Sequence, residues 1–130
     1  MLSDKVILIV DDDLTLLEMY VERIKAEGAI VIQAKDGEEA LTQAKDSKPH
    51  LMLLDIMMPK VNGLDVLKQL KENSETADIP IIVLSALADE EKKKIALSLG
   101  AADYIVKSEA LPIDVIGKIN AVLQPKIAGN

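Results

Sequence analysis

Charged and polar residues stand at the ends of hydrophobic runs in this sequence. The acidic stretch 11–13 follows the run KVILIV, and Asp55 lies within the otherwise apolar stretch LMLLDIMMP. Ser85 closes the run IPIIVLS, and Lys107 follows DYIV. A carboxylate is costly to bury unless a cation or hydrogen-bond donors pair with it. Asp55 therefore indicates a site where positive charge holds a carboxylate at the edge of the core.

Short hydrophobic runs alternate with segments of helical periodicity. The runs cover residues 5–10, 29–34, 50–55, 79–85 and 103–106, and each is predicted to be a strand, the first of them buried. Helices are predicted around residues 14–28, 40–44, 64–70, 88–100 and 115–123. Asp36 and Gly37 are predicted to form a turn.

This alternation predicts an α/β fold in which a parallel sheet is covered by helices on both faces. Right-handed crossovers favour a doubly wound arrangement. In a flavodoxin-like strand order of 2-1-3-4-5, the first and third strands are neighbours. Ligands bind to such sheets outside the carboxyl ends of the strands. The stretch 11–13, Asp55, Ser85 and Lys107 are therefore expected to share one crevice.

The expected crevice suits phosphoryl chemistry. Clustered carboxylates repel one another, and a hard divalent cation removes the conflict; Mg²⁺ is typically held by carboxylates, waters and a phosphate oxygen. A carboxylate can then act as a nucleophile and carry a phosphoryl group. Each residue alone has an ordinary explanation, such as a helix cap for Asp12, a turn for Ser85 or a surface position for Lys107. The prediction depends on their combination.

The composition indicates a single acidic domain. The chain has 130 residues, 49% hydrophobic and 28% charged, with a formal net charge of −7. We expect one domain over residues 1–124 and a short tail at 125–130. The negative charge argues against direct binding to nucleic acid, and no apolar run approaches the roughly 18 residues of a membrane span. The absence of cysteine excludes thiolate sites, and a cytoplasmic location away from membranes is expected.

The motifs ILIVDDD, LLDIMMPKVNG, IIVLSA and DYIVK resemble the receiver domain of two-component response regulators, of the CheY-like kind. The resemblance covers about residues 5–123 and implies a role for each motif. Asp11 and Asp12 would hold Mg²⁺, for which Mn²⁺ could substitute, and Met57 would add its backbone carbonyl. Asp55 would complete the metal ligands and would be the phosphoacceptor.

The resemblance also implies a conformational switch. Ser85 would hydrogen-bond the phosphoryl group, Lys107 would pair with a phosphoryl oxygen, and Tyr104 would turn inward when Ser85 moves. The surface of the fourth helix, fifth strand and fifth helix would then change for partner binding. The implied partners are a sensor histidine kinase or histidine phosphotransfer protein, and a downstream protein or an output domain absent from this chain. A phosphorylation-linked dimer is a further expectation, and turnover of an external substrate is not expected.

Two features depart from the pattern of that family. Ser108 follows Lys107, where the family usually has a proline in a cis peptide. A cis bond before another residue type costs about 2.5–4 kcal/mol, so we expect a trans bond or a reshaped loop. The connection 108–114 is also slightly longer than usual.

Met57 and Leu87 are apolar and offer no group that could position an attacking water, which predicts slow autodephosphorylation.

Two rival functions use the same residues differently. VDDDLT fits the D-x-D-x-T pattern of haloacid-dehalogenase-like phosphatases, in which Asp11 would be the nucleophile and Asp13 the acid/base, with Thr15 behind. That interpretation leaves Asp55 unexplained, and no clear acidic pair follows a later strand. The other alternative is a phosphorylation-independent interaction module. The complete set of acids, serine and lysine argues against it.

Overall fold

The structure is a computed structural model that describes residues 2–12, 14–56, 62–86 and 88–123, with only the backbone described for residues 14–17. Its strands are β1 (Val6–Val10), β2 (Ile30–Ala34), β3 (Leu51–Leu54), β4 (Ile81–Ser85) and β5 (Asp103–Val106). Its helices are α1 (Leu14–Ala26), α2 (Gly37–Ser47), α3 (Gly63–Glu72), α4 (Glu90–Ser98) and α5 (Pro112–Leu123), with a 3-10 helix η1 (Lys107–Glu109). Each strand lies within the hydrophobic run that predicted it.

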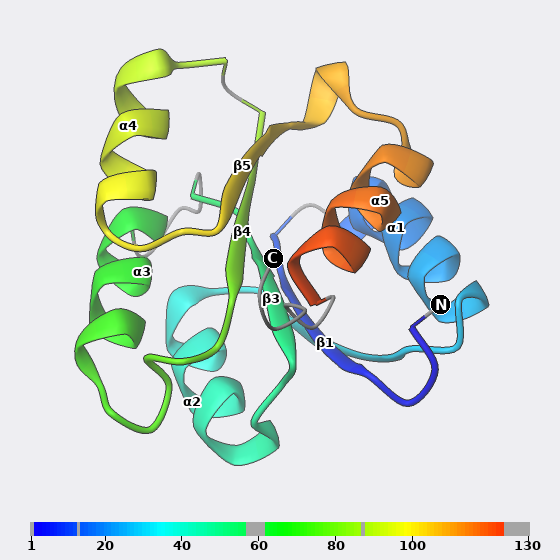
Figure 1. Cartoon of the computed structure of the whole chain (residues 1–130), viewed down its shortest axis with the longest axis horizontal. Coiled ribbons are helices and arrows are strands. Elements are labelled where there is room, and N and C mark those ends of the chain that lie inside the picture. The colour runs from blue at the N-terminus through cyan, green and yellow to red at the C-terminus, as the bar shows by residue number, and fades with distance from the viewer. Residues whose placement is uncertain (1, 13, 57–61, 87, 124–130) are drawn as a thin grey trace, which may run out of the picture.

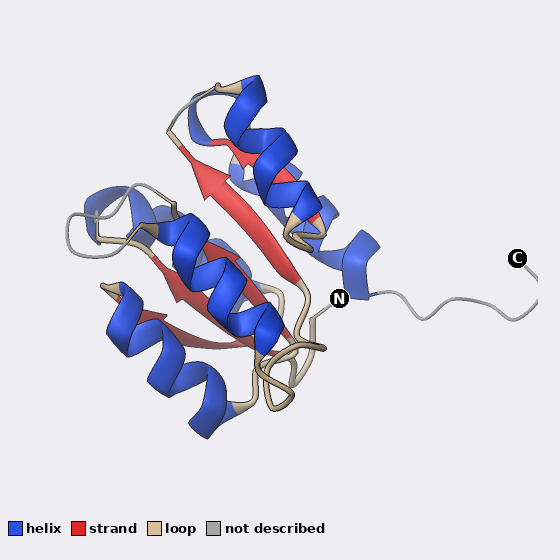
Figure 2. Ribbon diagram, turned by 90° about the vertical axis from the view of Figure 1, so that its left-hand side faces the viewer, coloured by secondary structure: helices blue, strands red, loops and turns tan. Residues whose placement is uncertain are grey.

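The strands form one parallel sheet in the order β2-β1-β3-β4-β5. Figure 2 shows the strands running in the same direction. Val10 pairs with Leu54 across β1 and β3, and Ser85 pairs with Val106 across β4 and β5. The flavodoxin-like order is thus confirmed, and the residues that follow β1 and β3 emerge side by side.

Helices cover both faces of the sheet, with α2, α3 and α4 on one face and α1 and α5 on the other (Figure 1). Successive residues of a strand point to opposite faces. In β1, Leu8 and Val10 pack under α2 to α4, whereas Ile7 and Ile9 pack under α1 and α5. Two-sided burial explains why β1, β3 and β4 read as continuous apolar runs, whereas β2 lies at the edge of the sheet and is largely exposed or half-buried. Two-sided burial also holds β1 and β3, which precede the acids, at the centre of the molecule.

Polar side chains define where three of the helices begin. The carboxylate of Asp36 accepts a hydrogen bond from the backbone N–H of Glu39, and Asn62 and Asp89 cap α3 and α4 in the same way. The turn predicted at Asp36 and Gly37 is therefore the start of α2, because the Asp36 side chain satisfies a helical N–H.

Within the part of the chain that the structure describes, no helix has the length and hydrophobicity to cross a lipid bilayer.

Candidate functional site

The candidate site begins with Asp11 and Asp55, each placed by the hydrogen bonds of the strand that precedes it. The backbone N–H of Asp55 donates to the carbonyl of Val10 at 2.9 Å, and the N–H of Asp11 donates to that of Ala34 at 3.0 Å. Both residues thus continue the ladder of the sheet by one position. Their side chains meet at the carboxyl edge, where an α/β sheet of this type binds its ligands.

Asp11, Asp12 and Asp55 form a compact acidic cluster. Each offers a carboxylate oxygen, and these oxygens lie within 4.8 Å of one another. Asp11 and Asp55 are 1% and 4% exposed, whereas Asp12 is exposed to solvent. Oxygen-only ligands, partly open to water, are the donor set that hard divalent cations such as Mg²⁺ and Mn²⁺ prefer. The residues therefore fit a divalent metal site.

Lys107 supplies the positive charge that was predicted to pair with the buried carboxylate of Asp55. Its Nζ lies 2.6 Å from Asp11 Oδ2 and 3.5 Å from Asp55 Oδ2, and its side chain is 7% exposed. Burial by itself would lower the pKa of Lys107, but the hydrogen bond and charge of Asp11, helped by Asp55, raise it above the usual lysine value. The amine is thus held in its charged form between two buried carboxylates.

Ser85 and Tyr104 lie on the same face of the sheet, on the adjacent strands β4 and β5. Ser85 is fully buried at the end of β4, and Tyr104 is 7% exposed on β5. Tyr104 is paired with Val83, two residues before Ser85, and both Val83 and Tyr104 pack in the core under α2 to α4. By the alternation of a strand, Ser85 faces this same side. The two predicted switch residues therefore face the same side of the sheet on adjacent strands, and their switch remains a prediction.

The connection after β5 differs from the pattern of the family, as the sequence predicted. The described peptide bonds include the one between Lys107 and Ser108, and none of them is cis. Residues Lys107–Glu109 form the 3-10 helix η1. Of the two expected alternatives, a trans bond or a reshaped loop, the trans bond is confirmed.

Two residues near the site were missed by sequence reasoning. Gly63 begins α3, and a Cβ built on it would lie 2.7 Å from the backbone oxygen of Asp55 and would overlap the backbone of Ile56. Tyr20 of α1 is buried, and its hydroxyl donates to the carbonyl of Ala110 at 3.5 Å. The glycine in PKVNG was a sequence signal for a close approach between two backbone segments. No signal indicated Tyr20, because the interpretation of that helix used only its aliphatic residues.

Some predicted residues lie outside the described part of the chain. These are Asp13, the proposed acid/base of the phosphatase alternative, and Met57 and Leu87, the apolar residues near the crevice. The backbone of Thr15 is described as part of α1, but its side chain is not. The metal contact expected from Met57 remains a prediction.

Comparison with curated proteins gives close relatives over almost the whole chain. The chain is 39% identical over 121 residues to the alkaline phosphatase synthesis transcriptional regulatory protein PhoP of Bacillus subtilis (strain 168), covering 93% of this chain and 49% of PhoP. It is 42% identical over 121 residues to the transcriptional regulatory protein CpxR of Escherichia coli (strain K12), covering 91% of this chain and 49% of CpxR. The chain therefore spans about half the length of these relatives.

Solved structures and a family model agree with these relatives. A putative response regulator from Chloroflexus aurantiacus J-10-fl has a TM-score of 0.87 and 30% identity over 93% of this chain and 98% of that one. The Mn²⁺-bound form of response regulator Rcp1 has a TM-score of 0.80 and 29% identity over 95% and 97%. The model of the response regulator receiver domain matches residues 7–114. The chain belongs to the response regulator receiver domain family, and it is therefore a signalling domain rather than an enzyme that turns over an external substrate.

Proposed function

We propose that Asp55 accepts a phosphoryl group from a phosphohistidine of a sensor histidine kinase or a histidine phosphotransfer protein, in a Mg²⁺-dependent reaction. The observation that carries this proposal is the position of one buried ammonium group. Lys107 Nζ contacts Asp11 at 2.6 Å and Asp55 at 3.5 Å, within a cluster completed by Asp12. A nucleophile held beside fixed positive charge meets the main requirement of phosphoryl transfer, which is positioning with charge neutralisation.

The proposed reaction is an in-line displacement at phosphorus. A carboxylate oxygen of Asp55 forms the new O–P bond as the N–P bond of the phosphohistidine breaks. The electron pair of the broken bond stays on the imidazole nitrogen, which takes up a proton from solvent. Lys107 moves its hydrogen bond from the Asp55 carboxylate to a phosphoryl oxygen. Asp11, Asp12 and Asp55 would hold Mg²⁺, which when bound neutralises negative charge on the phosphoryl oxygens.

The switch that follows would start at Ser85. Its hydroxyl would hydrogen-bond a phosphoryl oxygen, and Tyr104, already buried on the same face, would occupy the space beside it. This biases an equilibrium between two conformations by a local change of charge.

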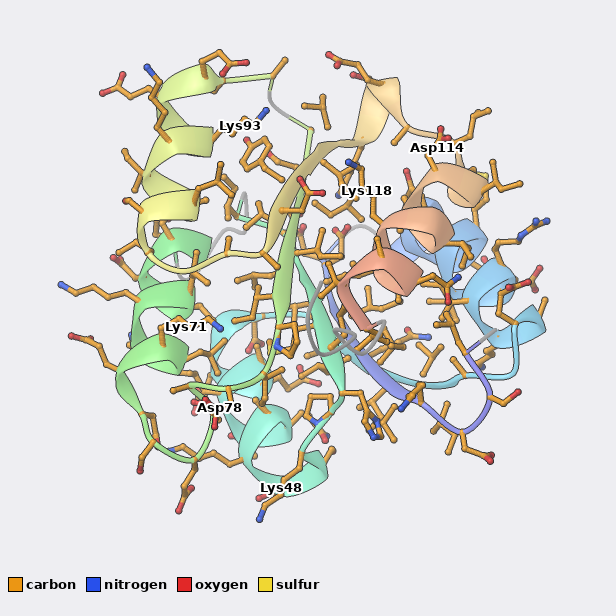
Figure 3. The ribbon with its side chains drawn as sticks, in the orientation of Figure 1. Lys48, Lys71, Asp78, Lys93, Asp114 and Lys118 are labelled. Atoms are coloured by element: carbon orange, nitrogen blue, oxygen red, sulfur yellow. The ribbon has the colours of Figure 1, made fainter. Side chains whose placement is uncertain are left out.

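The proposed output face covers α4, β5 and α5, where a cleft of about 400 Å³ lies between the two helices. Lys93, Asp114 and Lys118 line this cleft (Figure 3). Its mixed charges suit a protein partner, which would be a separate protein or an output domain of a longer chain.

The decisive experiment measures the intact mass of the protein after incubation with acetyl phosphate and Mg²⁺. One phosphoryl adduct is expected, absent in EDTA and absent in Asp55→Asn, and peptide mapping should place it on Asp55. Asp65→Asn is a matched control, because Asp65 is an exposed acid on α3, and it should label like the wild type. An adduct that survives Asp55→Asn would refute the proposal and favour a phosphatase-like nucleophile at Asp11. A folded wild type that binds Mg²⁺ but gains no adduct would favour the interaction module.

A further inference from the structure

The connection between β5 and α5 carries Lys107, and its far end is fixed to α5. The N–H of Leu111 donates to the carboxylate of Asp114 at 2.8 Å, and the N–H of Val115 donates to the carbonyl of Leu111 at 3.2 Å. Asp114 lies at the start of α5 (Figure 3). These bonds hold Leu111 but not the η1 segment itself, which contains the trans peptide between Lys107 and Ser108.

Tyr20 supports this connection from the neighbouring helix. α1 and α5 pack side by side on one face of the sheet (Figure 1). The Tyr20 side chain is 2% exposed within the core on that face, and Ala110 packs against the same core. The Tyr20 hydroxyl reaches the Ala110 carbonyl oxygen at 3.5 Å. The contact is long for an O–H donor, so this hydrogen bond is a weak one, and it is the hydroxyl that reaches the connection.

The pKa of the Tyr20 phenol reflects its burial and two charged side chains. Burial raises the pKa of Tyr20, the charge of Lys107 lowers it, and the charge of Asp11 raises it again. The net rise keeps the phenol neutral at physiological pH, so that it remains a donor. The geometric link to Lys107 is the Ala110 contact, three residues further along the same connection.

We infer that Tyr20 is a positioning residue for Lys107: by holding Ala110, it fixes the η1 segment and so sets where the ammonium group stands between Asp11 and Asp55. The physical reason is geometric. The segment from Lys107 to Ala110 has one end in β5 and the other at the Tyr20 contact. If Ala110 is no longer held, the Lys107 ammonium group can move away from the position in which it would bind a phosphoryl oxygen. The inference rests on the proposed function of Asp55 and Lys107.

The first test compares Tyr20→Phe, which removes only the hydroxyl, with Ile24→Val. Ile24 is one helical turn further along α1, is 1% exposed and packs in the same core, so its variant controls for a small loss of packing. The initial rate of Asp55 phosphorylation by acetyl phosphate is measured by intact mass at saturating Mg²⁺. We expect Tyr20→Phe to be about threefold slower than the wild type, as the loss of one neutral hydrogen bond implies, and Ile24→Val to react at the wild-type rate. Equal rates for the two variants would overturn the inference.

The second test is a double-mutant cycle with Lys107→Met. If Tyr20 acts through Lys107, the slowing caused by Tyr20→Phe disappears once the ammonium is gone. The same slowing in both backgrounds would show a merely structural role and would refute the inference. If Lys107→Met forms too little adduct for its rate to be measured, the hydrogen-exchange rates of the amides at 107–111 provide the test instead. Faster exchange there in Tyr20→Phe than in Ile24→Val supports the inference, and equal exchange overturns it.

Different results would refute the proposed function of Asp55 and the positioning role of Tyr20. A wild type that is not phosphorylated on Asp55 would remove the proposed function and the inference with it. A wild type that is phosphorylated, beside a Tyr20→Phe variant with an unchanged rate, would remove the inference alone.

Discussion

Lys107 is the residue on which the electrostatics of the site depend. Its ammonium group lies within 2.6 Å of Asp11 and 3.5 Å of Asp55, and its side chain is almost fully buried. A buried carboxylate left without its partner is strongly destabilising. The same cation would oppose a divalent metal bound by these acids, because like charges repel. Lys107 therefore has two opposite effects, one favourable to phosphoryl transfer and one unfavourable to metal binding.

Replacing Lys107 with methionine should separate these effects. We expect Lys107→Met to slow phosphorylation by acetyl phosphate by roughly a hundredfold, the usual effect of losing a group that stabilises transition-state charge. Its affinity for Mg²⁺ should rise by about tenfold, which corresponds to about 1.4 kcal/mol of relieved repulsion. Intact mass and titration calorimetry measure the two quantities.

The control is Lys118→Met, because Lys118 pairs with Asp103 at 3.2 Å on the surface and its side chain is 53% exposed. It should leave both values at the wild-type level. A loss of Mg²⁺ affinity in Lys107→Met would contradict the electrostatic account.

The raised pKa of Lys107 makes a prediction about stability and pH. Asp11 binds the protonated amine more tightly in the folded state, so the contribution of Lys107 to the free energy of unfolding is complete below the ordinary lysine pKa of about 10.4. This contribution is lost as pH rises through the higher folded-state value. Urea unfolding of wild type and Lys107→Met should give a constant difference from pH 7 to pH 9, and a smaller one above about pH 10.4. A difference that already shrinks between pH 7 and pH 9 would show that the amine is not held in its charged form.

At the scale of elements, the sequence was enough to predict contacts that follow from topology. Lys107 and Asp11 are 96 positions apart, yet their meeting was predictable, because parallel strands bring their carboxyl ends to one edge of the sheet. Tyr20 and Ala110 are 90 positions apart, and their contact was not predictable. The contact depends on how far one side chain of α1 reaches toward the connection between β5 and α5. That connection contains a 3-10 turn, which the periodicity of the sequence does not indicate. Strand ends thus carry information about the site that helix faces do not.

Gly63 shows how an element boundary constrains the site. A methyl group at this position would lie 2.7 Å from the Asp55 carbonyl oxygen and would overlap Ile56. We therefore expect Gly63→Ala to destabilise the protein by about 1–3 kcal/mol, the usual cost of overpacking, and to slow phosphorylation by displacing the backbone that carries Asp55.

Gly117 provides the matched control in α5, because a Cβ there would meet nothing within 4 Å. Gly117→Ala should raise stability by about 0.5–1 kcal/mol through helix propensity, with an unchanged phosphorylation rate. Urea unfolding and intact mass test both variants. Two glycine variants with the same effect would show that the contact with Asp55 is unimportant.

At the scale of the whole molecule, one sheet with a core on each face joins the site to global stability. Asp11 and Asp55 follow β1 and β3, whose side chains pack alternately into the two cores. The carboxylates can converge within 4.8 Å only while both strands are paired. Repulsion within the cluster is therefore a cost of the folded state, and a divalent cation that binds the cluster binds the folded state selectively.

This linkage predicts how Mg²⁺ and one exposed carboxylate act on unfolding. A ligand specific for the folded state stabilises it by about 2.7 kcal/mol at a hundred times its Kd, so wild-type stability should rise by that amount between EDTA and such a Mg²⁺ concentration. Asp12→Asn removes a charge from the solvent-exposed side of the cluster. It should unfold at the wild-type urea concentration or higher in EDTA, because repulsion is relieved, and should gain much less from Mg²⁺. Glu38→Gln, which alters an exposed acid at the start of α2, should keep the full gain. An equal gain in Asp12→Asn and wild type would mean that Mg²⁺ binds elsewhere, since a cation held by these carboxylates must lose affinity with one of its charges.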